Sequence, residues 1–217
     1  MKINKTFAVA TVACGMIFLP LSTASAKTFI GLDNSYGSYS VKSLSESSNS
    51  LSKSNLRTKA GARLFVGNYL NDNIRVYAYL QGDVKSDYNS TYYSGFTYSK
   101  LNIRSSEYGL GADYLYPINN TKLYAVGGVS LGRHSSVLGL DLKEGVVSDS
   151  KQSGLTTGIN LGMGYKFTDH FNMEAGARQS YLSGNKHTLS GVNGEENAYS
   201  YSFKSASQIY INLSYAF

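Results

Sequence analysis

The chain is poor in cysteine, proline and tryptophan. Its 217 residues include one Cys, two Pro and no Trp. The single cysteine, Cys14, lies in an N-terminal segment that we expect to be removed, so the mature protein would have no disulfide, thiol nucleophile or thiolate metal site. The scarcity of proline favours β-strands, because proline cannot donate to the hydrogen-bond ladder of a sheet. With 42% hydrophobic and only 16% charged residues, the composition excludes an intrinsically disordered chain.

The residues that are abundant also suit a sheet. The chain has 19 Tyr and 22 Gly, and aromatic side chains pack well on a pleated surface. The formal net charge of +6, to which the N-terminal segment contributes two lysines, is mild and scattered along the sequence. We therefore expect no nucleic-acid partner.

The first 26 residues have the pattern of a secretory signal peptide. Lys2 and Lys5 form a positive region, and an apolar run follows over residues 7–21. Small residues then lead up to Ala26, so we expect a signal peptidase to cleave between Ala26 and Lys27. The sequence thus predicts a cleaved signal peptide over 1–26 and a single domain over 27–217.

Two other interpretations of this segment fit less well. The apolar run is shorter than the roughly 20 residues that a membrane-spanning helix needs. A lipoprotein signal centred on Cys14 would place Thr11 where leucine is usual, and would leave an unusually short apolar region. Beyond residue 26 no long apolar run occurs, so a closed barrel is the route into a bilayer that stays open to the mature chain.

Eight segments of the mature chain alternate between apolar and polar residues with a period of two, which is typical of β-strands. The alternation is clearest over 154–167, 171–181 and 203–217, and it is noisier over 30–36, 59–67, 74–83, 107–116 and 123–131. Each segment is about as long as a tilted strand must be to cross a membrane.

The connections between these segments alternate in length. Short segments rich in turn-forming residues occur at 71–73, 117–121 and 168–170. Long polar segments lie around 38–55, 85–105, 133–153 and 183–200. All short connections therefore fall at one end of the predicted barrel, which is typical of outer-membrane barrels with short periplasmic turns and longer outer loops.

The polar face carries glycines and charges of both signs, unlike an ordinary solvent-facing surface. An eight-stranded barrel has an interior that side chains fill. We therefore predict that the apolar face contacts lipid, with tyrosines near its ends as interface girdles, rather than lining the ligand cavity of a soluble barrel. The charged residues of the polar face would form a structural ion network in the lumen: Asp33, Arg63, Arg75, Asp83, Glu107, Asp113, Lys166, Glu174, Arg178 and Lys204.

The last strand ends with Ile211, Leu213, Tyr215 and Phe217 on one face. This ending resembles the C-terminal signature by which the bacterial barrel-assembly machinery recognises its clients. In strand number and loop asymmetry, the whole mature chain resembles the small eight-stranded barrels that include the membrane domain of outer membrane protein A and the opacity-type adhesins. The resemblance implies an all-β fold: a closed, antiparallel, up-and-down transmembrane β-barrel in the bacterial outer membrane.

The sequence contains no motif for catalysis, a cofactor or a metal. The spacing of His134, His170 and His187 does not predict a metal cluster. His134 and Ser136, with Glu144 nearby, could form the Ser, His and acid set of a lipid-modifying hydrolase. The flanking residues do not resemble the deacylase pattern, so we favour a loop at the barrel rim. Glu174 and Arg178 are likewise interpreted as structural.

The expected function is therefore non-enzymatic. Long surface loops would contact host surfaces, other cells or the lipopolysaccharide of the envelope, with adhesion implied by the family resemblance. The four tyrosines over 88–98 would form either a contact surface or an extension of the girdle. The alternatives are a narrow porin-like channel and a lipid-modifying enzyme.

Overall fold

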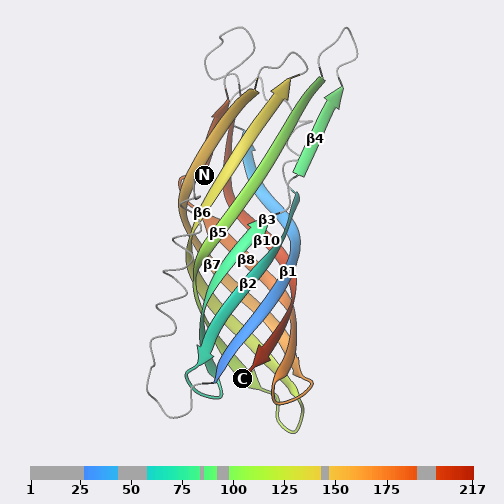
Figure 1. The fold of residues 1–217 in the computed structure, drawn as a ribbon, viewed down its shortest axis with the longest axis vertical. Helices are drawn as coiled ribbons and strands as arrows, with labels where there is room; N and C mark the ends of the chain where they lie inside the picture. The colour runs from blue at the N-terminus through green and yellow to red at the C-terminus, as the bar shows by residue number, and fades with distance from the viewer. Residues whose placement is uncertain (1–26, 44–57, 84–85, 92–97, 143–146, 190–198) are drawn as a thin grey trace, which may run out of the picture.

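The computed structural model describes residues 27–43, 58–83, 86–91, 98–142, 147–189 and 199–217. Within these ranges the chain forms one antiparallel sheet that closes into a barrel of tilted strands (Figure 1). Its strands are β1 (Thr28–Ser43), β2 (Thr58–Tyr69), β3 (Ile74–Asp83), β4 (Ser86–Thr91), β5 (Tyr98–Pro117), β6 (Leu123–Leu142), β7 (Val147–Lys166), β8 (Phe171–Leu182), β9 (Lys186–Leu189) and β10 (Tyr199–Ala216). No helix of the described residues is long and apolar enough to span a bilayer.

Ten strands make eight positions around the barrel. The order is β1-β2-β3-β5-β6-β7-β8-β10, and β10 pairs with β1 to close the ring. The two short strands continue positions that are already occupied: β4 pairs with β5 beyond the end of β3, and β9 pairs with β10 beyond the end of β8. The predicted eight-stranded up-and-down barrel is confirmed.

The alternating pattern turns apolar side chains outward over the lower part of the barrel. Leu161 is 69% exposed and Ile209 is 66% exposed, whereas Glu174 and Asp33 on the opposite face are each 1% exposed. A soluble barrel would have the reverse arrangement. The outward face is therefore built to contact hydrocarbon.

Aromatic side chains mark the two edges of this apolar band. Tyr36 and Tyr181 lie exposed at its upper edge. At the edge near the short turns the exposed aromatic residues are Tyr114, Tyr116, Tyr165, Phe167, Phe171, Tyr215 and Phe217. On β8 the band runs over 171–181, which matches the roughly 9–11 residues of a membrane-crossing strand.

Strands continue beyond the upper aromatic edge, contrary to the sequence prediction, and β5, β6 and β7 are the longest. The segments 98–105, 133–142 and 147–153, predicted as parts of long connections, belong to these three strands. Residues 38–43, 86–91 and 186–189, also predicted as parts of long connections, belong to β1, β4 and β9. We call the part of the barrel above the band the outer extension. Here the pattern inverts: Ile103 and Leu138 point inward and are buried, and Arg104 points outward. Water replaces lipid outside this part, so a polar outer face gives no sign of a loop.

A β-bulge in β10 corrects the predicted position of Lys204. Ser40 of β1 lies opposite Ser205, but the next residue, Val41, lies opposite Phe203, so Lys204 is the extra residue. A one-residue insertion exchanges the two faces of a strand. Lys204 is therefore exposed on the outside, and Phe203, predicted to face lipid, is 1% exposed inside the barrel.

Candidate functional site: the lumen and the outer collar

Arg75 connects opposite walls of the barrel. It lies on β3, and its guanidinium donates to Asp113 of β5 at 2.8 and 2.9 Å. On its other side it donates to both carboxylate oxygens of Glu174 at 2.7 and 2.8 Å. Strand β8, which carries Glu174, stands diametrically opposite β3 in the strand order. Paired, two-oxygen bonds of this kind are the strongest that a guanidinium makes.

Further polar contacts converge on the same level of the lumen. Glu174 also accepts hydrogen bonds from Tyr124 and Asn212, each at 2.7 Å. Arg178 of β8 pairs with Asp33 of β1 at 2.5 Å. Every formal charge at this level thus has a partner of opposite sign, as burial in a narrow lumen requires.

A second group of charges lies nearer the outer extension. Arg63 donates to Gln81 at 2.7 and 3.0 Å, and its Nη2 is 3.7 Å from Glu107. Lys59 pairs with Asp83 at 3.5 Å, and Tyr39 donates to the same carboxylate at 3.0 Å. Lys59 is absent from the predicted network. It lies on the polar face of its strand together with Arg63, and this shared face is the sequence signal that could have placed Lys59 in the lumen.

The ten residues predicted for the lumen network have three outcomes. Eight of them lie on the inner face and form these contacts: Asp33, Arg63, Arg75, Asp83, Glu107, Asp113, Glu174 and Arg178. Lys166 lies exposed at the mouth near the short turns, with its Nζ 5.9 Å from the Tyr124 ring. Lys204 points outward because of the bulge, so its assignment to the lumen is wrong.

Little space is left between these side chains. The void bounded by Asp33, Arg63, Tyr210 and their neighbours has a volume of about 10 Å³, which is about the space of one water. One carboxylate oxygen of Asp33 and the hydroxyl of Tyr210 are buried with no hydrogen-bond partner among the described residues.

Apolar clusters pack inside the barrel beside the charged groups. In the outer extension, Tyr39, Ile103, Leu138, Tyr201, Phe203 and Ala206 pack together. A second cluster consists of Phe29, Phe65, Tyr77, Tyr79 and Ala216, and on β3 its tyrosines lie between Arg75 and Gln81. The guanidinium of Arg63 lies 4.0 Å from the Tyr79 ring centroid, and this contact joins the second cluster to the charged groups.

His134 and Ser136 do not lie in a rim loop, as predicted, but inside the outer extension on β6. Ser136 is 1% exposed, and its hydroxyl lies 2.9 Å from Nε2 of His187 on β9, a residue also predicted to be in a loop. His187 Nδ1 bonds to the carbonyl oxygen of Ser150 at 2.9 Å, so no carboxylate orients this imidazole. His134 bonds to Thr156 at 3.1 Å. Burial lowers the pKa of both His134 and His187, which keeps the two rings neutral at neutral pH.

The remaining predicted residues do not assemble into a reactive site. His170 lies in a turn at the opposite end of the barrel, where Nδ1 contacts the carbonyl oxygen of Ala216 at 2.7 Å. The described residues include no group of three potential metal ligands. Glu144, the segment 1–26 and the side chains of 88–98 lie outside the described part of the structure. Ile211, Leu213, Tyr215 and Phe217 are exposed on the apolar band.

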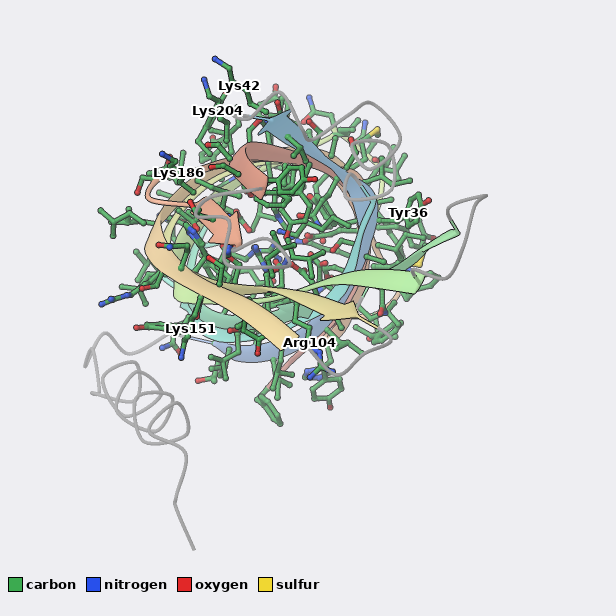
Figure 2. The ribbon with its side chains drawn as sticks, turned by 90° about the horizontal axis from the view of Figure 1, so that it is seen from above. Tyr36, Lys42, Arg104, Lys151, Lys186 and Lys204 are labelled. Carbon is green, nitrogen blue, oxygen red and sulfur yellow. The ribbon has the colours of Figure 1, made fainter. Side chains whose placement is uncertain are left out.

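Basic residues surround the outside of the outer extension. We call these six residues the outer collar: Lys42, Arg104, Arg133, Lys151, Lys186 and Lys204. Five of them are labelled in Figure 2, where their side chains point away from the barrel. Asp149 is the one exposed acidic side chain that the structure describes in this part of the barrel. Among the described residues, the outward surface above the apolar band therefore carries six basic side chains and one acidic one.

Comparison with known proteins identifies a family and a set of similar folds. The model of the family described as outer membrane protein beta-barrel domain matches residues 9–217. No curated protein matches the chain at a significant level.

Three solved structures illustrate the likeness of fold. Neisserial surface protein A is 17% identical with a TM-score of 0.52, and the match covers 89% of this chain and 99% of that one. The attachment invasion locus protein Ail of Yersinia pestis, solved in complex with the heparin analogue sucrose octasulfate, is 14% identical with a TM-score of 0.50 and coverage of 88% and 97%. A major outer membrane protein of Thermus thermophilus is 11% identical with a TM-score of 0.60 and coverage of 89% and 100%. At these identities the likeness concerns the fold alone.

Proposed function

Because the chain belongs to the outer membrane protein β-barrel domain family, and is thus an outer-membrane barrel, we propose that it is a closed, non-enzymatic anchor that presents its outer extension for contact with other surfaces. The observation that carries this proposal is the length of β5, β6 and β7. On β6 the strand runs from Leu131, the last lipid-facing residue, to Leu142. At about 3.4 Å per residue and a tilt of about 40°, this part rises roughly 25–30 Å above the band.

A contact role is supported by the construction of this extension. Its own apolar cluster around Leu138 gives it a packed interior above the membrane, and its outer face is basic. A rigid, charged platform held away from the bilayer suits encounter with polyanionic surfaces, because positive surface charge steers such partners. The sulfated ligand in the Ail complex is consistent with this chemistry for a barrel of similar fold.

Shortening the extension tests the contact role. Ser136 pairs with Gln152 across β6 and β7, so residues 137–151 can be replaced by a two-residue Asn-Gly turn without changing the register below. We expect this variant to assemble and to shift on unboiled gels as the wild type does, while bacteria that produce it bind less to sulfated glycans and host cells. Unchanged binding by such bacteria would contradict the proposal.

A closed lumen is supported by the contacts that cross it, above all those of Arg75 with Asp113 and Glu174. The competing function is a narrow porin-like channel. Planar-bilayer recordings discriminate the two: we expect no steady conductance for the wild-type protein. Large, regular current steps would favour the channel.

The absence of enzyme activity is supported by the enclosure of the Ser136–His187 pair. Both side chains are buried among the inner residues of the outer extension, whereas a lipid-modifying hydrolase must present its nucleophile to lipid. Ser136→Ala, His187→Ala and His134→Ala variants should leave the lipid profile of the producing cells unchanged. An altered lipid A or phospholipid profile in any of them would favour the enzyme.

The route of delivery to the outer membrane is a separate part of the proposal. We propose that residues 1–26 direct secretion and are removed before Lys27. The exposed series that ends in Phe217 would then be the signal read by the barrel-assembly machinery. Determining the N-terminal residue of the protein purified from outer membranes tests the cleavage position.

A further inference from the structure

Three lysines of the outer collar form a compact group on one side of the barrel. Lys42 of β1 and Lys186 of β9 both lie opposite Ser202 of β10, one on each side. Lys204, placed on the outside by the bulge, is the next outward residue along β10. Neighbouring strands are about 4.8 Å apart, so the three ammonium groups reach a shared patch of surface. We call this group the lysine triad; Figure 2 shows Lys42 and Lys204 side by side at the edge of the barrel.

No acidic partner neutralises the triad among the described residues. The exposed outward acid of the outer extension, Asp149, lies on β7, two residues from Lys151 and opposite Gly139 of β6. The bulge therefore has a consequence for charge as well as for geometry. Without the extra residue, Lys204 would face inward and Phe203 outward, and the triad would be a pair.

An apolar groove lies below the triad within the lipid-facing band, and the tilt of the strands displaces it around the barrel, as the positions of Tyr36, Lys42 and Lys204 in Figure 2 show. Its floor is Ala177 of β8, and the register sets Leu161 of β7 on one side of this alanine and Ile209 of β10 on the other. A small residue between two large ones leaves a depression. The groove has a volume of about 460 Å³ and extends to Tyr36 and Ser207 at the upper edge of the band. We call it the Ala177 groove.

A patch of serines connects the groove to the triad. Ser38 and Ser40 of β1 lie opposite Ser207 and Ser205 of β10. All four point outward, just above the aromatic edge that Tyr36 marks. Ser207 lines the groove, and Lys204 stands three residues further along the same strand, about 10 Å away. A molecule that spans these regions needs an acyl chain, a hydroxyl-rich middle and an anionic end, in that order.

We propose that the barrel surface from the Ala177 groove through the serines to the lysine triad is a binding site for a phosphorylated glycolipid of the outer leaflet. An acyl chain would occupy the groove, the sugar hydroxyls would exchange hydrogen bonds with the serines, and a phosphate would contact the lysines. Multiple ammonium groups around one phosphate are favourable because the phosphate carries up to two charges and three acceptor oxygens. The inference rests on the proposed outward placement of the outer extension, and not on its role in adhesion.

Affinity measurements on the folded full-length barrel in phosphatidylcholine nanodiscs test this site. The probe is a diphosphorylated, hexa-acylated glucosamine disaccharide lipid, and its binding is followed by native mass spectrometry. We expect Lys42→Gln, Lys186→Gln and Lys204→Gln, combined in one variant, to weaken binding at least tenfold. The matched control combines Arg104→Gln, Arg133→Gln and Lys151→Gln, which removes the same charge from another side of the collar and should change binding less than twofold.

A second pair of variants tests the groove. Ala177→Leu fills its floor and should weaken binding of the glycolipid about fivefold or more. Ala62→Leu adds the same atoms to an exposed position of β2, away from the groove, and should have no effect. Both variants retain every charge, so each should have the same stability to unfolding as the wild type and the same shift of the unboiled protein on gels.

The probes separate a lipid from a soluble polyanion. The dephosphorylated glycolipid should bind at least tenfold more weakly than the phosphorylated one, and sucrose octasulfate should not displace it at equal concentration. Equal losses in the two triple variants would overturn the site in favour of a diffuse collar. Effective displacement by the octasulfate, or an unchanged affinity in Ala177→Leu, would overturn the assignment to a lipid. Loss of cell adhesion in the shortened variant without loss of glycolipid binding would separate this inference from the proposed contact function.

Discussion

Replacing Arg75 with methionine removes the cation that joins three strands across the lumen. Met has a similar length and no charge, so the substitution leaves Asp113 and Glu174 facing each other without the guanidinium that contacts both of them. Glu174 keeps its hydrogen bonds from Tyr124 and Asn212 at 2.7 Å, which limits the loss. Breaking a buried ion pair by removing one partner costs about 3–5 kcal/mol. We expect the free energy of unfolding to fall by about that amount.

The assay must suit a protein without tryptophan. The refolded barrel can be titrated with urea in lipid vesicles, and the folded fraction can be measured from the shift of unboiled protein on gels. This titration gives the midpoint and the slope of the unfolding transition. Glu174→Gln is the control. It removes one charge but retains an amide oxygen that can accept from Arg75 and Tyr124, and it should cost less than half as much. A loss below about 1 kcal/mol for Arg75→Met would show that the cross-lumen contacts contribute little to stability.

Three other perturbations have expected outcomes. Ile159→Arg, on the lipid face of β7, should destabilise the barrel by about 2–4 kcal/mol in urea titrations, whereas Ser153→Arg, above the band on the same strand and face, should have little effect; equal effects would mean that the band is misplaced. Burial lowers the pKa of His187, so the unfolded chain binds a proton more readily than the folded protein does. The free energy of unfolding should therefore fall as the pH drops below about 6.5, and hydrogen exchange in β9 should become faster. His187→Gln should reduce this pH dependence. Deletion of Phe217 should slow assembly, so that pulse-labelled protein accumulates in the periplasm; assembly at the normal rate would argue against a role in recognition.

The barrel was predictable from the sequence because one physical rule governs its lower half. Lipid outside and a narrow polar lumen inside force alternation, as in the series Ile209, Ile211 and Leu213 against Gln208, Tyr210 and Asn212. This alternation alone therefore predicted an inward position for Arg75 and Glu174. It could not predict that these two residues meet across the lumen, since that depends on the closure of β1 against β10.

The outer extension was missed because the same rule changes above the membrane. Arg133 and Ser135 face water there, and the buried partners His134 and Ser136 are polar as well, so β6 loses its contrast between faces. Pairing of His187 with Ser136 joins residues 51 positions apart, which no local pattern reports. The bulge at Lys204 likewise gives no recognisable signal in the sequence. One extra residue does not alter the kind of residues found in β10, but it reverses the inward and outward faces of the strand beyond it.

Closure of the ring also fixes where an added polypeptide can emerge. The amide of Phe217 donates to the carbonyl oxygen of Thr28 at 2.9 Å, so both ends of the barrel sequence meet at the rim that carries the short turns. In proteins of this architecture that rim faces the periplasm. A fluorescent tag or affinity handle fused to either end would therefore stay hidden from the outside of the cell. An epitope intended for surface display should instead be spliced into a connection at the other end, such as the one between β6 and β7, which have 20 residues each.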